Sequence, residues 1–160
     1  MDDERPPAEE TPKARANREL IELLNELRVV LPGITVLLGF LLAVPFARGW
    51  TRVTEFQRDV FLVAFLATAV SVALFTAPTS YHRLRFRHGD KERVLVVGNR
   101  FAIAGIAAAA VSLEAVVLLV TDFVVSRGFA IAAAGSLLVV VAALWYGLPL
   151  WAALRDRSAR

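Results

Sequence analysis

Reactive side chains are scarce in this sequence. Its 160 residues contain no cysteine, two histidines and one methionine, whereas 57% of them are hydrophobic. The lack of cysteine excludes a disulfide-stapled secreted domain and a thiolate metal site, and the hydrophobic fraction excludes a disordered protein. Nucleophile motifs, phosphate-binding glycine loops and dinucleotide fingerprints are also missing. The composition therefore excludes a soluble two-domain enzyme, and we predict neither enzymatic activity nor a cofactor.

Charged residues are rare within four long apolar runs. We predict membrane-spanning helices at about residues 29–46, 60–77, 101–120 and 129–154, because an α-helix needs about 20 residues to cross about 30 Å of hydrocarbon. The predicted fold class is all-α, an integral membrane four-helix bundle preceded by an amphipathic N-terminal helix. The bundle occupies residues 17–154, with cytoplasmic tails at 1–16, which we expect to be flexible, and at 155–160.

The segment before the first span has a helical pattern of its own. Leucines recur there at three- and four-residue spacing, which predicts an amphipathic helix over residues 18–31 with Asn17 as its N-cap. Pro32 predicts a bend between this helix and the first span. The helix then lies at the membrane surface or leads directly into the span. Residues 1–18 contain no apolar segment or cleavage site, so we expect no cleavable signal peptide.

Further local signals mark the ends of the later helices. Thr54-Glu55-Phe56-Gln57 matches a capping box that begins the second span, and Pro78 is expected to follow that span. Gly89 and Asp90 predict a turn and an N-cap before the third helix.

The distribution of basic residues predicts the orientation. Of 18 Lys and Arg residues, 14 lie on the side that holds both termini, which the positive-inside rule places in the cytoplasm of a bacterial inner membrane. The most basic stretch, between spans two and three, is expected to contact anionic lipid head groups. Its basic residues are Arg83, Arg85, Arg87, Lys91 and Arg93. Pairing of its arginines with Glu19, Glu22 and Glu26, or binding of an anionic ligand, are the alternatives.

The same basic residues do not indicate nucleic acid or a metal. The aromatic residues lie in the spans and do not alternate with Lys and Arg, so the net charge of +3 is not a nucleic-acid signal. His82 and His88 are six residues apart and have no carboxylate cluster nearby at metal-ligand spacing. We therefore predict no nucleic-acid partner and no metal site.

Glu114 is the most informative residue for function. It is the one ionisable residue between residues 101 and 120, and an unpaired carboxylate there costs several kcal/mol. It is a candidate proton- or cation-binding site, or a neutral acid that bonds across helices. From its depth, roughly 6 Å beyond the midplane, we predict that it faces the bundle interior near Thr68 or Ser136.

The third span also carries a stripe of small residues that lets another helix approach closely. The stripe consists of Gly98, Ala102, Gly105, Ala109 and Ser112. Its centre lies roughly opposite Glu114 on a helical wheel. We therefore expect the third helix to be buried on two faces, one of them a candidate interface with a second copy of the chain.

Several runs resemble a known family. They are the residues from Glu22 to Gly33, Thr54 to Val60, Ala77 to Arg83, Gly89 to Arg93, and Asn99-Arg100. Across residues 20–150 the chain resembles a family of small four-span membrane proteins of unknown function from high-GC bacteria. Members of that family are often labelled sodium:proton antiporter, so the resemblance implies cation transport as one function.

Two functional hypotheses follow from these observations. The first is a structural, partner-binding or regulatory membrane protein, which needs only the spans and their flanking segments. The alternative is a proton- or cation-coupled transporter that works as an oligomer with Glu114 as its titrating residue. Against transport stand the short chain and the lack of Gly- or Pro-broken helices at the membrane midplane.

Overall fold

Four long helices make up the computed structural model, which describes residues 11–85, 91–148, 151, 154 and 155. They are α1 (Pro12–Ala43), α2 (Glu55–Arg85), α3 (Lys91–Val124) and α4 (Arg127–Ala142). Two 3-10 turns, η1 (Val44–Phe46) and η2 (Arg48–Arg52), join α1 to α2, and a π-helical turn, η3 (Ala143–Gly147), continues α4. The described residues contain no strand, and all four helices are long and apolar enough to cross a membrane. The predicted all-α four-helix architecture is confirmed.

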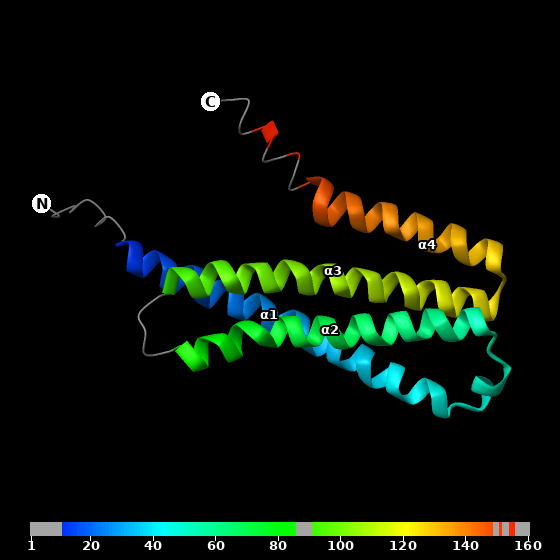
Figure 1. The fold of residues 1–160 in the computed structure, drawn as a ribbon. Coiled ribbons are helices and arrows are strands. Elements are labelled where there is room, and N and C mark those ends of the chain that lie inside the picture. Colours follow the sequence, from blue (N-terminus) through cyan, green and yellow to red (C-terminus); the bar gives the residue numbers. More distant parts are fainter. Residues whose placement is uncertain (1–10, 86–90, 149–150, 152–153, 156–160) are drawn as a thin grey trace, which may run out of the picture.

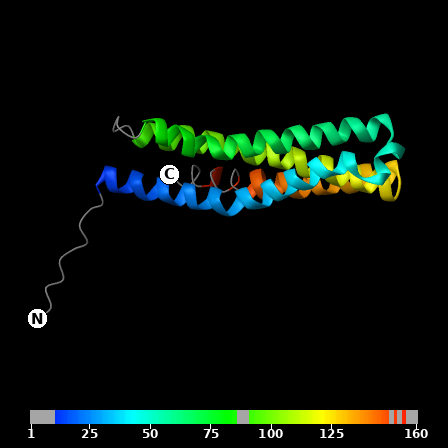
Figure 2. The same ribbon diagram turned by 90° about the horizontal axis from the view of Figure 1, so that it is seen from below.

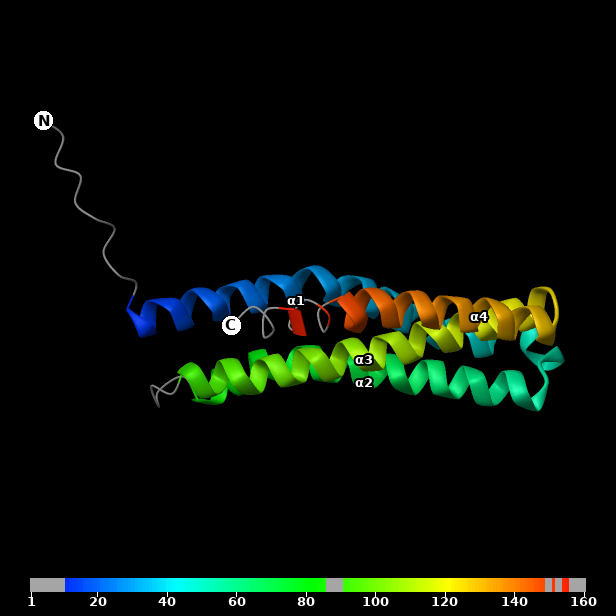
Figure 3. The same cartoon turned by 90° about the horizontal axis from the view of Figure 1, so that it is seen from above.

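The helices alternate in direction around α3 (Figure 1). Helix α3 packs against each of the other three, and its closest partner is α2. Helix α1 crosses the α2–α3 pair obliquely, and α1 and α4 lie on the same side of that pair (Figures 2 and 3). Within the described residues the backbone of α4 approaches α3 but neither α1 nor α2. The bundle is therefore open along α4.

The α2–α3 interface is held by small residues and hydroxyl groups. The predicted small-residue stripe of α3 is buried at this interface and beneath α1. A Cβ atom on Gly105 would lie 2.7 Å from the ring of Phe75, and one on Gly98 would lie 3.2 Å from the side chain of Leu23. The close approach that the sequence indicated is thus made within one chain, between α3 and its neighbours.

The N-terminal segment belongs to the bundle and leads directly into the first span. Helix α1 is continuous from Pro12 to Ala43 with Pro32 inside it, and Leu23 and Leu27 form a core cluster with Phe75 of α2. A proline is tolerated in such a helix because its ring is exposed here and a break would leave further backbone groups without partners in hydrocarbon. The predicted surface helix and first span are therefore one element.

Several predicted helix ends are also shifted. Thr11, and not Asn17, caps α1, since its side chain accepts a hydrogen bond from the amide of Ala14 at 3.3 Å and Pro12 follows at N1. Helix α2 runs through the buried Pro78 to Arg85. Helix α3 continues to Val124, which leaves a much shorter loop before α4 than expected. The turn predicted at Gly89 and Asp90 lies outside the described residues, as does part of the expected fourth span.

The capping box at the start of α2 is confirmed. The backbone amide of Thr54 donates to Oε1 of Gln57 at 3.1 Å, and the amide of Gln57 donates to Oγ1 of Thr54 at 3.3 Å. The reciprocal bonds satisfy two amides that the first turn of the helix would otherwise leave free.

Replacing Gly105 by Ala tests the close packing of α2 on α3. The added methyl group meets the buried ring of Phe75, so we expect a loss of about 1–3 kcal/mol in the free energy of unfolding. The measurement is the unfolding midpoint of the purified protein in detergent. The matched control is Gly39→Ala, where a Cβ meets nothing within 4 Å; equal midpoints for the two variants would contradict the packing described.

Candidate functional site

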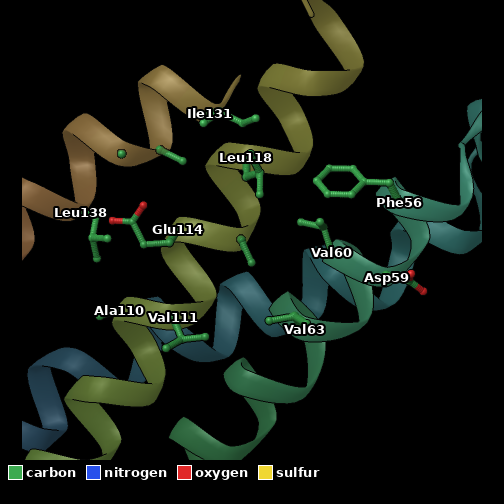
Figure 4. A pocket seen from close by; sticks show the side chains of 13 residues that line it. Phe56, Asp59, Val60, Val63, Ala110, Val111, Glu114, Leu118, Ile131 and Leu138 are labelled. Carbon is green, nitrogen blue, oxygen red and sulfur yellow. The ribbon is translucent and has the colours of Figure 1, made fainter. Parts of the chain in front are cut away.

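Glu114 lies on the side of α3 that faces α4, half-buried in the chain. Its carboxyl group points toward α4 (Figure 4). The Oε1 atom is enclosed and has no hydrogen-bond partner among the described residues. This is the single buried side-chain oxygen or nitrogen without a partner in the described part of the chain, and it lies within a predicted span.

Glu114 lines a pocket of about 660 Å³ between three helices (Figure 4). Helix α3 forms its floor, and α2 and α4 form its walls. The lining residues are Phe56, Asp59, Val60, Val63, Ala110, Val111, Glu114, Ala115, Leu118, Ile131, Ala134, Gly135 and Leu138. The pocket exists because α4 packs on α3 alone, which leaves the space between α4 and α2 unfilled.

The chemistry of this pocket is almost wholly apolar. Apart from Glu114, the one ionisable lining residue is Asp59, which is exposed and points away from Glu114 in Figure 4. Helix α4 contributes only small and aliphatic side chains. Within the described residues no group of three His, Asp or Glu side chains is arranged to hold a metal ion. Apart from the exposed Asp59, Glu114 is therefore surrounded by apolar lining residues.

The predicted partners of Glu114 lie elsewhere, and this corrects the expectation from depth. Thr68 is fully buried between α2 and α3, where its hydroxyl contacts that of Ser112 at 2.5 Å and donates to the carbonyl of Ala64 at 2.7 Å. Ser136 is exposed and donates to the carbonyl of Ala132 in its own helix at 2.8 Å. Neither hydroxyl bonds to Glu114.

Glu114 does not bond to Thr68 because the two side chains at this depth of α3, those of Ser112 and Glu114, point to different sides of the helix. Residues 112 and 114 are two apart, so their side chains leave the helix about 200° from each other. Ser112 therefore occupies the polar layer that depth alone assigned to Glu114, donating at 3.1 Å to the carbonyl of Ala64. About one turn after Thr68 on α2, Ser71 donates to the carbonyl of Gly105 at 2.9 Å. These hydroxyls link α2 to α3, whereas Glu114 faces the opposite side.

A second polar cluster, which sequence reasoning missed, closes one end of the pocket. Oδ2 of Asp122 accepts a bond from Nε2 of Gln57 at 2.8 Å, and its Oδ1 accepts one from Nε of Arg127 at 2.6 Å. The guanidinium carbon of Arg127 lies 3.6 Å from the ring centroid of Phe56, which is a cation–π contact. We call these four residues the clamp. They join the start of α2, the end of α3 and the start of α4.

The clamp had a signal in the sequence that could have revealed it. Asp122 directly follows an apolar run, and Arg127 follows it by five residues. A carboxylate at that position needs a partner, since its side chain is only 5% exposed. The sequence interpretation placed both residues in a loop, whereas α3 extends past Asp122 and directs its side chain to α2 and α4.

The described residues of the basic stretch are exposed. Arg83 and Arg93 are exposed, Arg87 lies outside the described residues, and nothing is described of the side chains of Arg85 and Lys91. Arg83 lines a groove between α1 and α2 that also holds Arg28. Glu19 and Glu22 form ion pairs with Arg15 and Arg18 of their own helix, at 2.9 and 3.1 Å.

These features define a class of protein. Four apolar helices of membrane-spanning length and an open bundle are those of a multi-pass membrane protein. The chain belongs to a family of unknown function, DUF6328, whose model matches residues 9–149. No curated protein and no solved structure matches it significantly. The match confirms membership of a family of unknown function, and the activity is undetermined.

Replacing Glu114 or Asp122 by leucine compares the environment of the unpaired acid with that of the paired one. We expect Glu114→Leu to raise the free energy of unfolding by about 1–3 kcal/mol, because it removes a buried polar group that has no partner. We expect Asp122→Leu to lower it, because Gln57 and Arg127 lose their shared acceptor. Unfolding midpoints in one detergent measure both. A loss of stability in Glu114→Leu would mean that the carboxyl group is bonded across helices.

Proposed function

We propose that this protein acts by binding a partner molecule within the membrane, and that it is not an enzyme. The observation that carries the proposal is the pocket on α3, which is lined by three helices and by Glu114, whose buried Oε1 has no hydrogen-bond partner among the described residues. Ionisable residues inside spans are costly, and they mark ligand and ion pathways more often than packing positions. Concave, mostly apolar pockets with few polar groups are typical of small-molecule sites.

The pocket is reached from the side. Its wall residues Leu138 and Ile131 on α4 are exposed, as are Val63 and Val111. In the proposed topology four helices cross the bilayer and both termini lie in the cytoplasm, on the side with more Arg and Lys. These exposed apolar residues then face lipid chains. A partner would enter laterally from the hydrocarbon, and it would be a molecule that partitions into lipid.

Cation-coupled transport of the sodium:proton type is the second candidate, and its support is the single intramembrane acid. An inorganic cation needs several oxygen ligands, whereas the pocket offers the carboxyl group of Glu114, an exposed Asp59 that points away from it, and otherwise apolar walls. The family description names no activity. Binding therefore accounts for more of the geometry than ion exchange does.

Photo-crosslinking in the native membrane tests the binding function. A photoreactive residue at Leu138, which lines the pocket, is expected to give a discrete adduct. The matched control is the next residue, Val139, which is exposed and does not line the pocket; we expect it to react only with bulk lipid. Equal, lipid-only products from the two positions would contradict binding in the pocket.

Ion flux through liposomes tests the second candidate. We expect purified, folded protein to give no sodium-driven proton movement, because the pocket lacks the oxygen ligands that a small cation requires. The measurement uses a pH-sensitive dye inside the vesicles, with Glu114→Gln beside wild type. Sodium-driven flux that is present in wild type and lost in Glu114→Gln would overturn the binding proposal in favour of transport.

A further inference from the structure

The unpaired oxygen of Glu114 is unusual among the polar atoms of this chain. The hydroxyls of Thr68, Ser71 and Ser112 are fully buried, and each has a hydrogen-bond partner. The carboxyl of Asp122 accepts bonds from two side chains. Glu114 Oε1 alone is buried without a partner among the described residues. Glu114 also lines the pocket, so a molecule bound there is the candidate for the missing partner.

The size of the pocket limits the occupant. A volume of about 660 Å³ lies within the range of small-molecule sites. On its floor the lining residues run from Ala110 to Leu118, which is about two turns of α3. The clamp closes one end, where Phe56 is both a lining residue and the platform for Arg127. A compact ligand fits this outline better than a spanning helix of a second copy, which would need a groove along most of α3.

The lining determines the polarity of the ligand. Apart from the carboxyl group of Glu114 it gives a ligand inside the pocket almost no hydrogen-bonding group, so a polar headgroup or an ester would leave its own atoms without partners. One carboxyl group in such surroundings suits one positive charge attached to an apolar body. A tertiary ammonium carries one N–H donor for the carboxylate, and its other three substituents on nitrogen are apolar.

We propose that the pocket around Glu114 binds a lipophilic tertiary amine as its ammonium form, with the Glu114 carboxylate as counter-ion. This inference rests on the proposed binding function and specifies the ligand class. The apolar groups of the amine fill the space between α2 and α4, and its N–H donates to the Glu114 carboxylate. Glu114 thereby gains the partner that the chain itself does not supply.

A proton transfer makes the binding neutral overall. The amine crosses the hydrocarbon as the uncharged base and meets the carboxylic acid form of Glu114, the form that an apolar surrounding favours. The O–H bond of the acid breaks and an N–H bond forms on the amine, giving an ammonium–carboxylate pair of zero net charge. Since the same amine is cationic in water, binding from solution releases one proton for each ligand bound.

The other charged groups near the pocket do not compete for this proton. Asp59 on α2 is the second ionisable lining residue, and it is exposed at the rim. Helix α4 contributes no ionisable lining residue, and on α3 Glu114 is the only one. Arg127 stacks on the lining residue Phe56 but is paired with Asp122. The released proton is therefore expected to depend on Glu114.

Calorimetric titration of the full-length protein in nanodiscs tests the proposal. The probe is a naphthyl-bearing N,N-dimethylalkylamine, with empty nanodiscs as blank. We expect saturable binding that weakens at least about tenfold in Glu114→Gln and for the neutral carbon-for-nitrogen isostere of the probe. The trimethylammonium analogue, which has no N–H, should also bind more weakly. Repeating the titration in buffers of different ionisation enthalpy is expected to report one proton released.

Matched variants separate the pocket from general effects on the fold. Gly135→Leu should block binding, because the residue lines the pocket and a Cβ there meets nothing within 4 Å. Gly39→Leu is the matched control, because a Cβ there also meets nothing within 4 Å and the residue lies on α1, outside the lining; it should bind like wild type. Equal binding by wild type and Glu114→Gln, no proton release, or binding no greater than in empty nanodiscs would overturn the proposal.

The crosslinking and titration results together distinguish failure of the amine proposal from failure of the proposed binding function. A discrete adduct at Leu138 in cells, together with no binding of the amine, would leave a binding protein whose ligand is not an amine. Absence of both would remove the proposed function as well. A stable dimer that shields Leu138 from the photoreactive probe would overturn the amine proposal, because a second copy would then fill the pocket.

Discussion

Hydrocarbon offers no water to hydrogen-bonding groups, and this constraint governs the structure. Every polar group within a span must find its partner inside the protein or carry a cost of several kcal/mol. The hydroxyls of Thr68, Ser71 and Ser112 meet the requirement by donating to carbonyl oxygens, and those of Ser71 and Ser112 do so across the α2–α3 interface. Glu114 Oε1 does not meet it within the described chain, and the functional argument begins from that exception.

The open architecture leaves a pocket beside Glu114. Helices α2 and α3 approach closely because Gly105 leaves room for Phe75, whereas α4 rests on α3 alone. The clamp around Asp122 fixes the start of α4 relative to α2 without filling the space between them. A pocket therefore remains on α3, and Glu114 lies within it. Stability comes from one side of α3, and the proposed binding site occupies the other.

Much of the fold could be predicted from the sequence, because span length, small-residue spacing and the Thr54–Gln57 capping box are local signals. The course of α1 through Pro32 could not, since it depends on how Leu23 and Leu27 pack against distant helices. Glu114 was identified as the key residue, but depth alone gave it the wrong partners. Depth orders residues along the membrane normal, whereas the rotation of α3 decides which helix each one faces. The clamp joins residues 65 apart in the sequence, which no local pattern reports.

The most direct test of the central claim is the state of the Glu114 carboxyl group in the ligand-free protein. The infrared spectrum of wild type in lipid, minus that of Glu114→Gln, isolates its absorption. The account predicts the C=O band of a protonated carboxylic acid that accepts no hydrogen bond. When the amine binds, this band should be replaced by the pair of bands of a carboxylate. A carboxylate signal, or a strongly hydrogen-bonded acid, in the ligand-free protein would contradict it.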